Sequence, residues 1–271
     1  MTKQNKIENK ARRLWGEDLH KDSSVSPHCT QLADAFPSKW NKSLTGSLLE
    51  IGCGSGSDLK IFSSIQSLNN ITAIDLGFNV FTLAKRYEDR KDILIKRGNA
   101  LSLDFDDETF DVVYSFGIFH HTSNPTLCIE EARRVLKQGG TMFLYLYSSH
   151  EDMIFKRMGV FIERIIMSFF RHIPYKMQNL ICILLSPICW ALFTVPSILL
   201  SYFGFTDFAK KIPFFFGRHP FSLIGDLKDR LMSPINHRFT KLQIETILQS
   251  LKFECIEVIK APSGLYIYSK K

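Results

Sequence analysis

Two adjacent histidines, His120 and His121, are the side chains of this chain best suited to move a proton. They stand in the loop F-G-I-F-H-H-T at 116–122, after the apolar run 111–116. An imidazole has an unperturbed pKa of about 6.5, so it can take a proton from a hydroxyl near neutral pH. We predict that His121, with His120 as the alternate, contacts or deprotonates a substrate. A purely structural role, in which both side chains bond backbone groups and shape the loop, stays open.

A glycine-rich turn suggests a second chemistry, the binding of a ribonucleoside. The segment 48–59, L-L-E-I-G-C-G-S-G-S-D-L, is an apolar strand pattern that runs through G-x-G-x-G into a helical pattern. Glycines allow a ligand to lie against the backbone. A second strand pattern ends in Asp75, where a carboxylate can accept hydrogen bonds from both ribose hydroxyls.

Two alternatives to a ribonucleoside site follow from the same residues. A dinucleotide fingerprint, G-x-G-x-x-G, needs glycine where this chain has Ser57, so a nicotinamide enzyme is disfavoured. The turn could also bind no ligand, with Asp75 serving as a helix N-cap.

These motifs require an α/β sheet to position them. Short apolar runs at 47–51, 71–74, 93–95, 111–116 and 141–147 alternate with helical patterns at 58–68, 78–90 and 125–137. The alternation predicts a parallel sheet covered by helices, with Gly139-Gly140 ending the last helix. A helix over 240–251, with Thr240 as its N-cap, and strands over 253–259 and 265–268 are expected to complete the sheet.

The segment 48–56 resembles the first motif of class I S-adenosylmethionine-dependent methyltransferases. Gly98-Asn99-Ala100 is similar to the family's G-D-A, 110–115 to its fourth strand, and R-V-L-K-Q-G-G at 134–140 to its R-V-L-K-P-G-G. Asn99 and Gln138 depart from the usual acid and proline. The H-H-T resembles the loop of the small-molecule branch, which includes ubiquinone and menaquinone biosynthesis methyltransferases. The resemblance covers about residues 47–147.

The resemblance implies a Rossmann-like α/β fold, with a mostly parallel seven-stranded sheet and helices on both faces. It implies S-adenosyl-L-methionine as the cofactor and methyl transfer to a small acceptor, with oxygen as the expected atom and no metal. The cofactor site would comprise Glu50, Gly52, Cys53, Gly54, Gly56, Asp75, Leu76, Asn99, Ala100 and Phe116. The alternative function is a non-catalytic nucleoside-binding protein of the same fold that docks a partner or a membrane.

Two missing motifs argue against nucleic acid as the substrate. No N/D-P-P-Y motif follows the fourth strand, as methylation of an exocyclic base amine would require, and no P-C nucleophile for a pyrimidine ring is present. The basic residues stand among apolar runs rather than with stacking aromatics on a polar face. We therefore expect a small-molecule acceptor and no nucleic acid.

Residues 151–236 leave the α/β rhythm and predict an apolar, basic helical insertion. Between Glu151 and Arg238, eleven Lys or Arg residues stand against six Asp or Glu. The uncharged run 180–205 is long enough to cross a bilayer, although Pro187 and Pro196 are expected to break a helix there. If the final strands join the first sheet, both flanks of the insertion lie on one side of a membrane, which excludes a single crossing.

Two interpretations of the insertion remain open. Arg157, Arg164 and Arg171 recur every seven residues among apolar positions, which suits contact of 156–205 with an anionic membrane surface. The same pattern fits a helix whose apolar face is buried, as in a lid over the acceptor site. Either arrangement would suit a lipophilic acceptor.

The chain is therefore expected to comprise an N-terminal helical segment (1–46, with helices at 11–15 and 31–40), a cofactor-binding core (47–150 and 237–271) and the insertion (151–236). His237 and Arg238 stand in S-P-I-N-H-R-F-T at 233–240, which resembles a turn near the acceptor in similar methyltransferases. Both are candidate substrate residues, although they could equally cap a helix or face water.

Composition sets the remaining limits. The chain has 271 residues, of which 45% are hydrophobic, enough for one α/β core with an insertion. Its six cysteines include no C-x-x-C pair, so neither a disulfide framework nor a zinc site is indicated. The polar first ten residues lack the apolar segment of a secretory signal, so we expect a cytoplasmic location, with the cytoplasmic membrane face as the alternative.

Overall fold

The computed structural model describes residues 28–151, 154–209, 212, 214, 217, 219–261 and 264–271. The chain divides into two compact units. The core unit comprises Met1–Glu151 and Ile235–Lys271, and the helical unit comprises Asp152–Pro234. The helix predicted at 11–15 lies outside the described residues.

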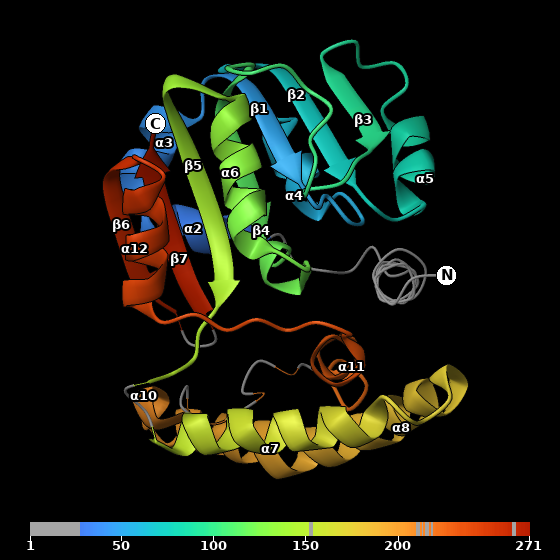
Figure 1. Cartoon of the computed structure of the whole chain (residues 1–271). Helices are drawn as coiled ribbons and strands as arrows, with labels where there is room; N and C mark the ends of the chain where they lie inside the picture. The colour runs from blue at the N-terminus through green and yellow to red at the C-terminus, as the bar shows by residue number, and fades with distance from the viewer. Residues whose placement is uncertain are drawn as a thin grey trace. The chain divides into compact units, whose positions relative to one another are not determined.

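The core unit contains a seven-stranded sheet with the order β3-β2-β1-β4-β5-β7-β6 (Figure 1). Neighbouring strands from β3 to β5 run parallel, whereas β7 is antiparallel to both β5 and β6. The predicted mostly parallel seven-stranded sheet is confirmed, including the return of the last two strands to it. The strands are β1 (Gly46–Ile51), β2 (Leu68–Asp75), β3 (Ile93–Arg97), β4 (Phe110–Phe116), β5 (Leu136–Tyr147), β6 (Glu254–Lys260) and β7 (Gly264–Lys270).

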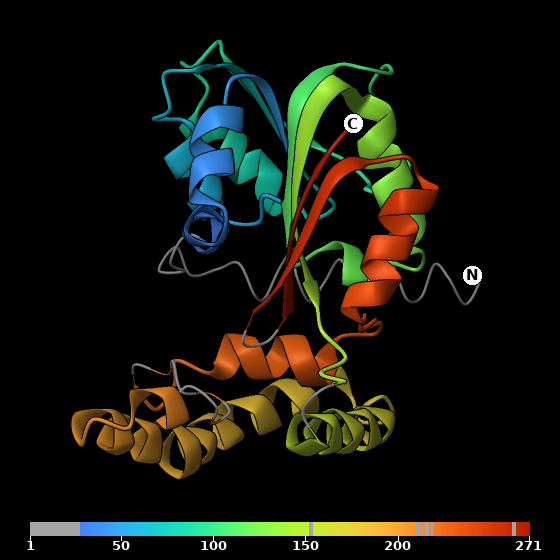
Figure 2. The same cartoon turned by 90° about the vertical axis from the view of Figure 1, so that its left-hand side faces the viewer.

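Helices cover both faces of this sheet, as Figure 2 shows. On one face, α6 (Pro125–Val135) and α12 (Lys241–Ser250) pack against a buried apolar cluster that includes Leu49 of β1. The next residue, Leu48, points into a second cluster on the other face. Alternate burial of this kind is typical of central strands covered on both sides. The second cluster is covered by α2 (Cys29–Ala35), α3 (Pro37–Ser43), α4 (Ser57–Phe62) and α5 (Asn79–Arg86).

The N-terminal helix predicted over 31–40 is two helices in the structure. α2 ends at Ala35, and α3 begins at Pro37. Proline lacks an N–H and disfavours helical backbone in the residue before it, so it suits the first position of a new helix. Phe36, between the two helices, has a ψ of 51° and is buried in the core.

The prediction that Gly139-Gly140 ends α6 is wrong. The helix ends at Val135, and β5 begins directly at Leu136. The backbone N–H of Thr109 donates to the carbonyl of Val135 at 2.8 Å. Pairing with the segment before β4 therefore ends the helix four residues before Gly139. Gly139 instead forms a positive-φ kink inside β5 (φ +74°), and its N–H bonds the carbonyl of Lys271 at 2.7 Å.

α12 begins directly after Thr240, the residue predicted to be its N-cap. The Thr240 hydroxyl accepts the backbone N–H of Gln243 at 3.0 Å, and the Gln243 side chain accepts the N–H of Thr240 at 2.9 Å. These reciprocal bonds form a capping box. The predicted N-cap is therefore confirmed.

The helical unit is formed by α7 (Ile154–Phe170), α8 (Tyr175–Cys189), η4 (Trp190–Thr194), α9 (Val195–Tyr202), α10 (Thr206–Ala209) and α11 (Ile224–Met232). Within this unit, α11 packs against both α7 and α8. α8, η4 and α9 join into one continuous helix, Tyr175–Tyr202. The expected break at Pro187 and Pro196 does not occur. η4 is a π-helical turn that ends two residues before Pro196, and such a turn shifts the backbone hydrogen-bond register where proline supplies no N–H.

Candidate functional site

The glycine loop connects β1 to α4 and needs glycine at both of its ends. Gly52 has a φ of +87° and Gly56 a φ of +82°, a left-handed region that side chains disfavour. A Cβ on Gly56 would lie 2.5 Å from Leu83 Cδ1, and a Cβ on Gly52 would collide with the side chain of Ile118. Ile118 stands three residues before His121, so the histidine loop packs directly on the glycine loop.

Asp75 lies at the carboxyl end of β2 and is buried. Its Oδ2 accepts the N–H of Gly54 at 3.0 Å, and its Oδ1 accepts the N–H of Gly77 at 2.7 Å. The N-cap of α5 is Phe78, so the alternative in which Asp75 caps a helix is wrong. An ionised carboxylate has about four lone-pair positions. The Asp75 carboxylate thus retains acceptor capacity for ribose hydroxyls while it holds the loop.

Glu50 lies at the end of β1, with only 2% of its surface exposed. Among the described residues its Oε2 has no hydrogen-bond partner. Burial raises the pKa of Glu50 well above its ordinary value, and the negative charges of Asp58 and Asp75 raise it further. A buried carboxylate beside two others is stabilised by a cation. The end of β1 therefore fits a positively charged ligand group.

The other predicted cofactor residues gather at the same edge of the sheet. The N–H of Gly98 bonds the carbonyl of Asp75 at 3.0 Å, which brings the segment Gly98-Asn99-Ala100 beside β2. Asn99 Oδ1 accepts the N–H of Leu101 at 3.0 Å, and Ala100 is buried. The carbonyl of Leu76 accepts Arg97 Nε at 3.0 Å, and burial raises the pKa of the Cys53 thiol.

Phe116, at the end of β4, stacks on two aromatic rings. Its ring centroid lies 4.2 Å from that of Tyr145, with an interplanar angle of 9°, and 4.8 Å from that of His28, at 19°. Burial lowers the pKa of His28, which favours the neutral ring, although nearby Asp58 acts in the opposite direction. These contacts place the start of α2 beside the site.

Asp58 holds the start of α2 to the sheet. Its Oδ1 accepts the backbone N–H groups of His28 and Cys29 at 2.6 and 3.1 Å, and its Oδ2 accepts the hydroxyl of Tyr114 at 2.5 Å. Sequence reasoning missed Asp58 and Tyr114. An acid in the first turn of α4 was the available signal, since carboxylates favour helix N-termini and their free N–H donors.

The histidine loop forms the short 3₁₀ helix η3 (Phe119–His121), in which both histidines are buried. His121 Nδ1 lies 2.9 Å from the carbonyl oxygen of Ile235. A carbonyl only accepts, so Nδ1 carries the proton in the neutral ring and Nε2 bears the lone pair. The ring of His120 stacks on Tyr147, with centroids 3.9 Å apart at 26°. Tyr147, at the end of β5, was not predicted.

The chain returning from the helical unit completes this group. His237 donates its N–H to the carbonyl of His120 at 2.8 Å, and the Arg238 guanidinium lies 5.2 Å from the centroid of the Tyr147 ring. Burial lowers the pKa of His237. The structure thus brings the four predicted acceptor-side residues together, with the rings of His120 and His121 and the Arg238 guanidinium beside Tyr147. Since Thr240 is the N-cap of α12, neither His237 nor Arg238 caps that helix.

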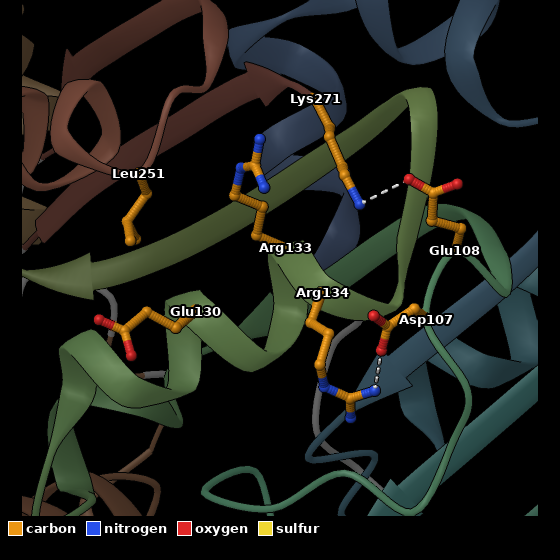
Figure 3. Close-up of a pocket in the computed structure, with 7 residues that line it drawn as sticks. All are labelled: Asp107, Glu108, Glu130, Arg133, Arg134, Leu251 and Lys271. Atoms are coloured by element: carbon orange, nitrogen blue, oxygen red, sulfur yellow. Dashed lines mark hydrogen bonds and ion pairs between the residues drawn. The ribbon is translucent and has the colours of Figure 1, made fainter.

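A cavity of about 590 Å³ lies at the opposite edge of the sheet. Figure 3 shows the residues that line it. It lies at the amino ends of β4 and β5, whereas ligands of open α/β sheets bind at the carboxyl ends. Arg134 Nη1 is 2.8 Å from Asp107 Oδ1, and Lys271 Nζ is 3.3 Å from Glu108 Oε1. Four of the six charged side chains that line the cavity therefore lie in ion pairs, and we assign the cavity no chemistry. The lining residues are Asp107, Glu108, Glu130, Arg133, Arg134, Leu251 and Lys271.

Within the described ranges, no group of three or more His, Cys, Asp or Glu residues could hold a metal ion. The glycine loop after β1, the acid after β2 and the sheet order define a Rossmann-like nucleoside-binding core. Residues 49–144 match the family model described as a methyltransferase domain.

Curated proteins of known name show the same relationship. The chain is 25% identical to 27-O-demethylrifamycin SV methyltransferase of Amycolatopsis mediterranei, over 49% of this chain and 52% of that protein. It is 26% identical to demethylmenaquinone methyltransferase of Staphylococcus aureus, over 45% and 52% respectively. Identity to ubiquinone biosynthesis O-methyltransferase of Candida albicans is 30%, over 36% and 31%. The chain thus spans about half the length, or less, of these relatives.

A solved structure of a proposed methyltransferase from Bacillus halodurans has the same fold. Its TM-score is 0.52 at 14% identity, and the match covers 90% of this chain and 98% of that one. Residues 49–144 thus form a methyltransferase domain of the class I S-adenosylmethionine-dependent superfamily. Membership implies S-adenosyl-L-methionine as the cofactor, and the unpartnered Glu50 oxygen and the Asp75 carboxylate fit its cationic and ribose parts.

Proposed function

We propose that this protein transfers a methyl group from S-adenosyl-L-methionine to an oxygen of a small acceptor, with His121 as the general base. The observation that supports this most directly is the contact between the two loops, in which Ile118 lies against Gly52. The hydroxyl of Ser115 also donates to the carbonyl of Ile51 at 2.9 Å. Methyl transfer needs donor and acceptor held in line, and this packing fixes the cofactor loop beside the histidine loop.

The chain's own residues would hold the cofactor by charge and hydrogen bonds. Asp75 would accept the ribose hydroxyls, Glu50 would face the positive charge of the methionine part, and Ala100 would lie by the adenine. When bound, S-adenosyl-L-methionine would supply an electrophilic methyl group on a sulfonium, with S-adenosylhomocysteine, a neutral thioether, as the leaving group. The carboxylates at the end of β1 and β2 thus favour the cationic donor over its neutralised product.

On the acceptor side, His121 would remove the hydroxyl proton as the new oxygen–carbon bond forms. The proton moves to Nε2, and the resulting imidazolium keeps its Nδ1–H bond to the Ile235 carbonyl. That bond orients the ring. His237 and Arg238 are the proposed substrate residues, because they lie against the same histidine–tyrosine cluster.

The proposed acceptor is lipophilic and small, and nucleic acid is not expected. Phe116, Tyr145 and Tyr147 give the carboxyl edge of β4 and β5 an aromatic surface. Two of the relatives have names that specify methylation at oxygen, one on a demethylrifamycin and one in ubiquinone biosynthesis. A cytoplasmic location stays a prediction.

A label-transfer experiment tests the proposal. The purified protein is incubated with methyl-labelled S-adenosylmethionine and host extract, and the products are partitioned between organic solvent and water, with Asp75→Ala as the control. We expect Asp75-dependent label in the organic phase. Binding of S-adenosylhomocysteine without any labelled product would contradict the enzyme and favour the non-catalytic alternative. Label confined to the aqueous phase would contradict the lipophilic acceptor.

A further inference from the structure

The helical unit carries most of the exposed apolar surface of the described chain. Of 23 large hydrophobic side chains that are exposed, 18 belong to this unit. On α7 they include Phe161 and Phe169, and on the helix Tyr175–Tyr202 they include Leu184 and Leu192, with exposed fractions of 59% and 63%. We call the exposed apolar side chains of these two helices the apolar surface. Exposed apolar side chains in such number are typical of sites that interact with partners or membranes.

The helix Tyr175–Tyr202 has its polar and apolar sides reversed relative to a helix of a water-soluble domain. Its buried positions include Gln178, Ser186, Thr194 and Ser197. Each of these side chains donates to a backbone carbonyl within the unit, for example Ser186 to Pro220 at 2.7 Å and Thr194 to Phe214 at 2.6 Å.

This reversal indicates what surrounds the helix. In water, an amphipathic helix turns its polar side outward. In a bilayer, small and polar residues lie at the helix contacts, and aliphatic residues face the lipid. Only 17% of the apolar window of Tyr175–Tyr202 is buried, and the helix is long and apolar enough to cross a membrane. Its outward side is therefore suited to hydrocarbon.

The charges of the helical unit fit an anionic lipid surface. Residues 177–206 contain no charged side chain, whereas Arg157, Arg164 and Arg171 are exposed at seven-residue intervals along one side of α7 and just beyond its end. Glu163 lies 3.9 Å from Arg230, and Asp226 lies 2.9 Å from the same guanidinium, so two acids of the unit pair within it. Exposed arginines beside an apolar surface are the pattern of interfacial helices, which bind anionic headgroups.

The topology excludes a single membrane crossing. β5 precedes the helical unit and β7 follows it, and the two strands pair antiparallel from Thr141 to Tyr147. Both ends of the unit therefore connect to one sheet and must lie on one side of a bilayer. α11, which carries Asp226, Lys228, Asp229 and Arg230, packs against both α7 and α8 and keeps them in one unit.

We propose that the helical unit docks on an anionic lipid bilayer, with the apolar surface inserted in one leaflet and Arg157, Arg164 and Arg171 against the headgroups. This interaction goes beyond methyl transfer, which does not require it. Protein interfaces surround an apolar centre with a polar, hydrogen-bonded rim, whereas the helix carries no charged side chain from 177 to its end at Tyr202 and offers few groups for such a rim. Lipid is therefore a better occupant than a second copy of the chain.

Vesicle flotation of the full chain tests this docking. We compare vesicles of phosphatidylcholine with vesicles that contain about one-third phosphatidylglycerol. We expect flotation with the anionic vesicles and weaker binding to the neutral ones. Leu184→Glu with Leu192→Glu should abolish it. Leu242→Glu is the matched control, because Leu242 is 70% exposed on α12 of the core unit, and this variant should float like the unmodified chain.

The arginines are tested separately. Replacing Arg157, Arg164 and Arg171 together with Gln should lower affinity for the anionic vesicles more than about tenfold, since each basic residue near such a surface contributes about fivefold. Binding to neutral vesicles should stay unchanged. An equal loss on both vesicle types would contradict a headgroup contact.

Three results would overturn the proposal: no flotation of the unmodified chain, flotation of the Leu184→Glu, Leu192→Glu variant, or a lipid-free dimer that this variant breaks while vesicles are not bound. The last result would assign the apolar surface to a second copy. Phe161→Ser with Phe169→Ser provides an independent test on α7. Binding of S-adenosylhomocysteine by every variant shows that the core unit is folded and separates this proposal from the proposed activity.

Discussion

The imidazole Nδ1 of His121 lies 2.9 Å from the carbonyl oxygen of Ile235, 114 residues later in the chain. A second hydrogen bond joins the same two segments, because the N–H of His237 donates to the carbonyl of His120 at 2.8 Å. The segment that follows the helical unit therefore sets both the tautomer and the orientation of the proposed base. Because a backbone carbonyl holds the His121 ring, the Nε2 lone pair keeps a fixed direction, as a general base requires.

Replacing this histidine tests its role as a base. His121→Ala is expected to lower kcat about 10²- to 10⁴-fold, the usual contribution of general-base catalysis. The affinity for S-adenosylhomocysteine, measured by calorimetry, should change little, because Asp75 and Glu50 hold the cofactor. His219→Ala, an exposed histidine of the helical unit, is the control. Full turnover by His121→Ala would restrict His121 to a structural role.

Asp75 is expected to dominate cofactor affinity. Asp75→Ala removes two proposed bonds to ribose hydroxyls and two bonds to backbone N–H groups of the loop. Hydrogen bonds to charged groups contribute about 1.5–3 kcal/mol each, so the Kd for S-adenosylhomocysteine should rise at least about tenfold. Asp104→Ala, whose side chain is fully exposed, should leave the Kd unchanged. Unaltered binding by Asp75→Ala would place the nucleoside elsewhere.

Glu50 is expected to lower the stability of the ligand-free protein as the pH rises, while its charge strengthens cofactor binding. Its native-state pKa is raised above the ordinary value of 4.5, so the native state holds a proton that the unfolded chain releases. The stability linked to this group is complete below the unfolded-state pKa and is lost as the pH rises through the native-state pKa. Glu50→Gln cannot ionise and should show a smaller loss of Tm as the pH rises above the ordinary carboxyl pKa of 4.5.

The same substitution should weaken binding of the cationic donor. Glu50→Gln removes the negative charge that faces it, so affinity for S-adenosylmethionine should fall more than affinity for S-adenosylhomocysteine, which lacks the sulfonium charge. Calorimetry with both ligands measures the difference. If both affinities fall equally, Glu50 supports the loop rather than the charge.

The contact between Gly52 and Ile118 is tested by a pair of substitutions. Gly52→Ala should destabilise the protein and reduce cofactor binding, because φ is +87° and the new Cβ would meet Ile118. Ile118→Ala removes the collision but not the backbone strain, so the double variant should recover part of the lost Tm. Thermal unfolding of the four proteins gives the coupling. Strictly additive effects would show that the two loops do not press on each other.

Local patterns in the sequence determined much of the fold and of the cofactor side. The alternation of short apolar runs with helical patterns predicted the parallel sheet and the return of its last two strands, because a strand buried on both faces is a near-continuous apolar run that a short window reveals. The glycine loop and Asp75 were predicted for a related reason. Backbone conformation and strand-end position act over a few residues, so residue type and spacing suffice to recognise them.

Contacts between distant segments could not be predicted from local patterns and are seen in the folded chain alone. The bond of His121 to Ile235, the stacking of His28 on Phe116 and the three bonds to Asp58 join segments separated by tens of residues or more. Long-range pairing also ended α6 at Val135, before the glycines that local propensity favoured. Such contacts depend on where the folded chain crosses itself, and tertiary packing overrides preferences that are worth about 1 kcal/mol per residue or less.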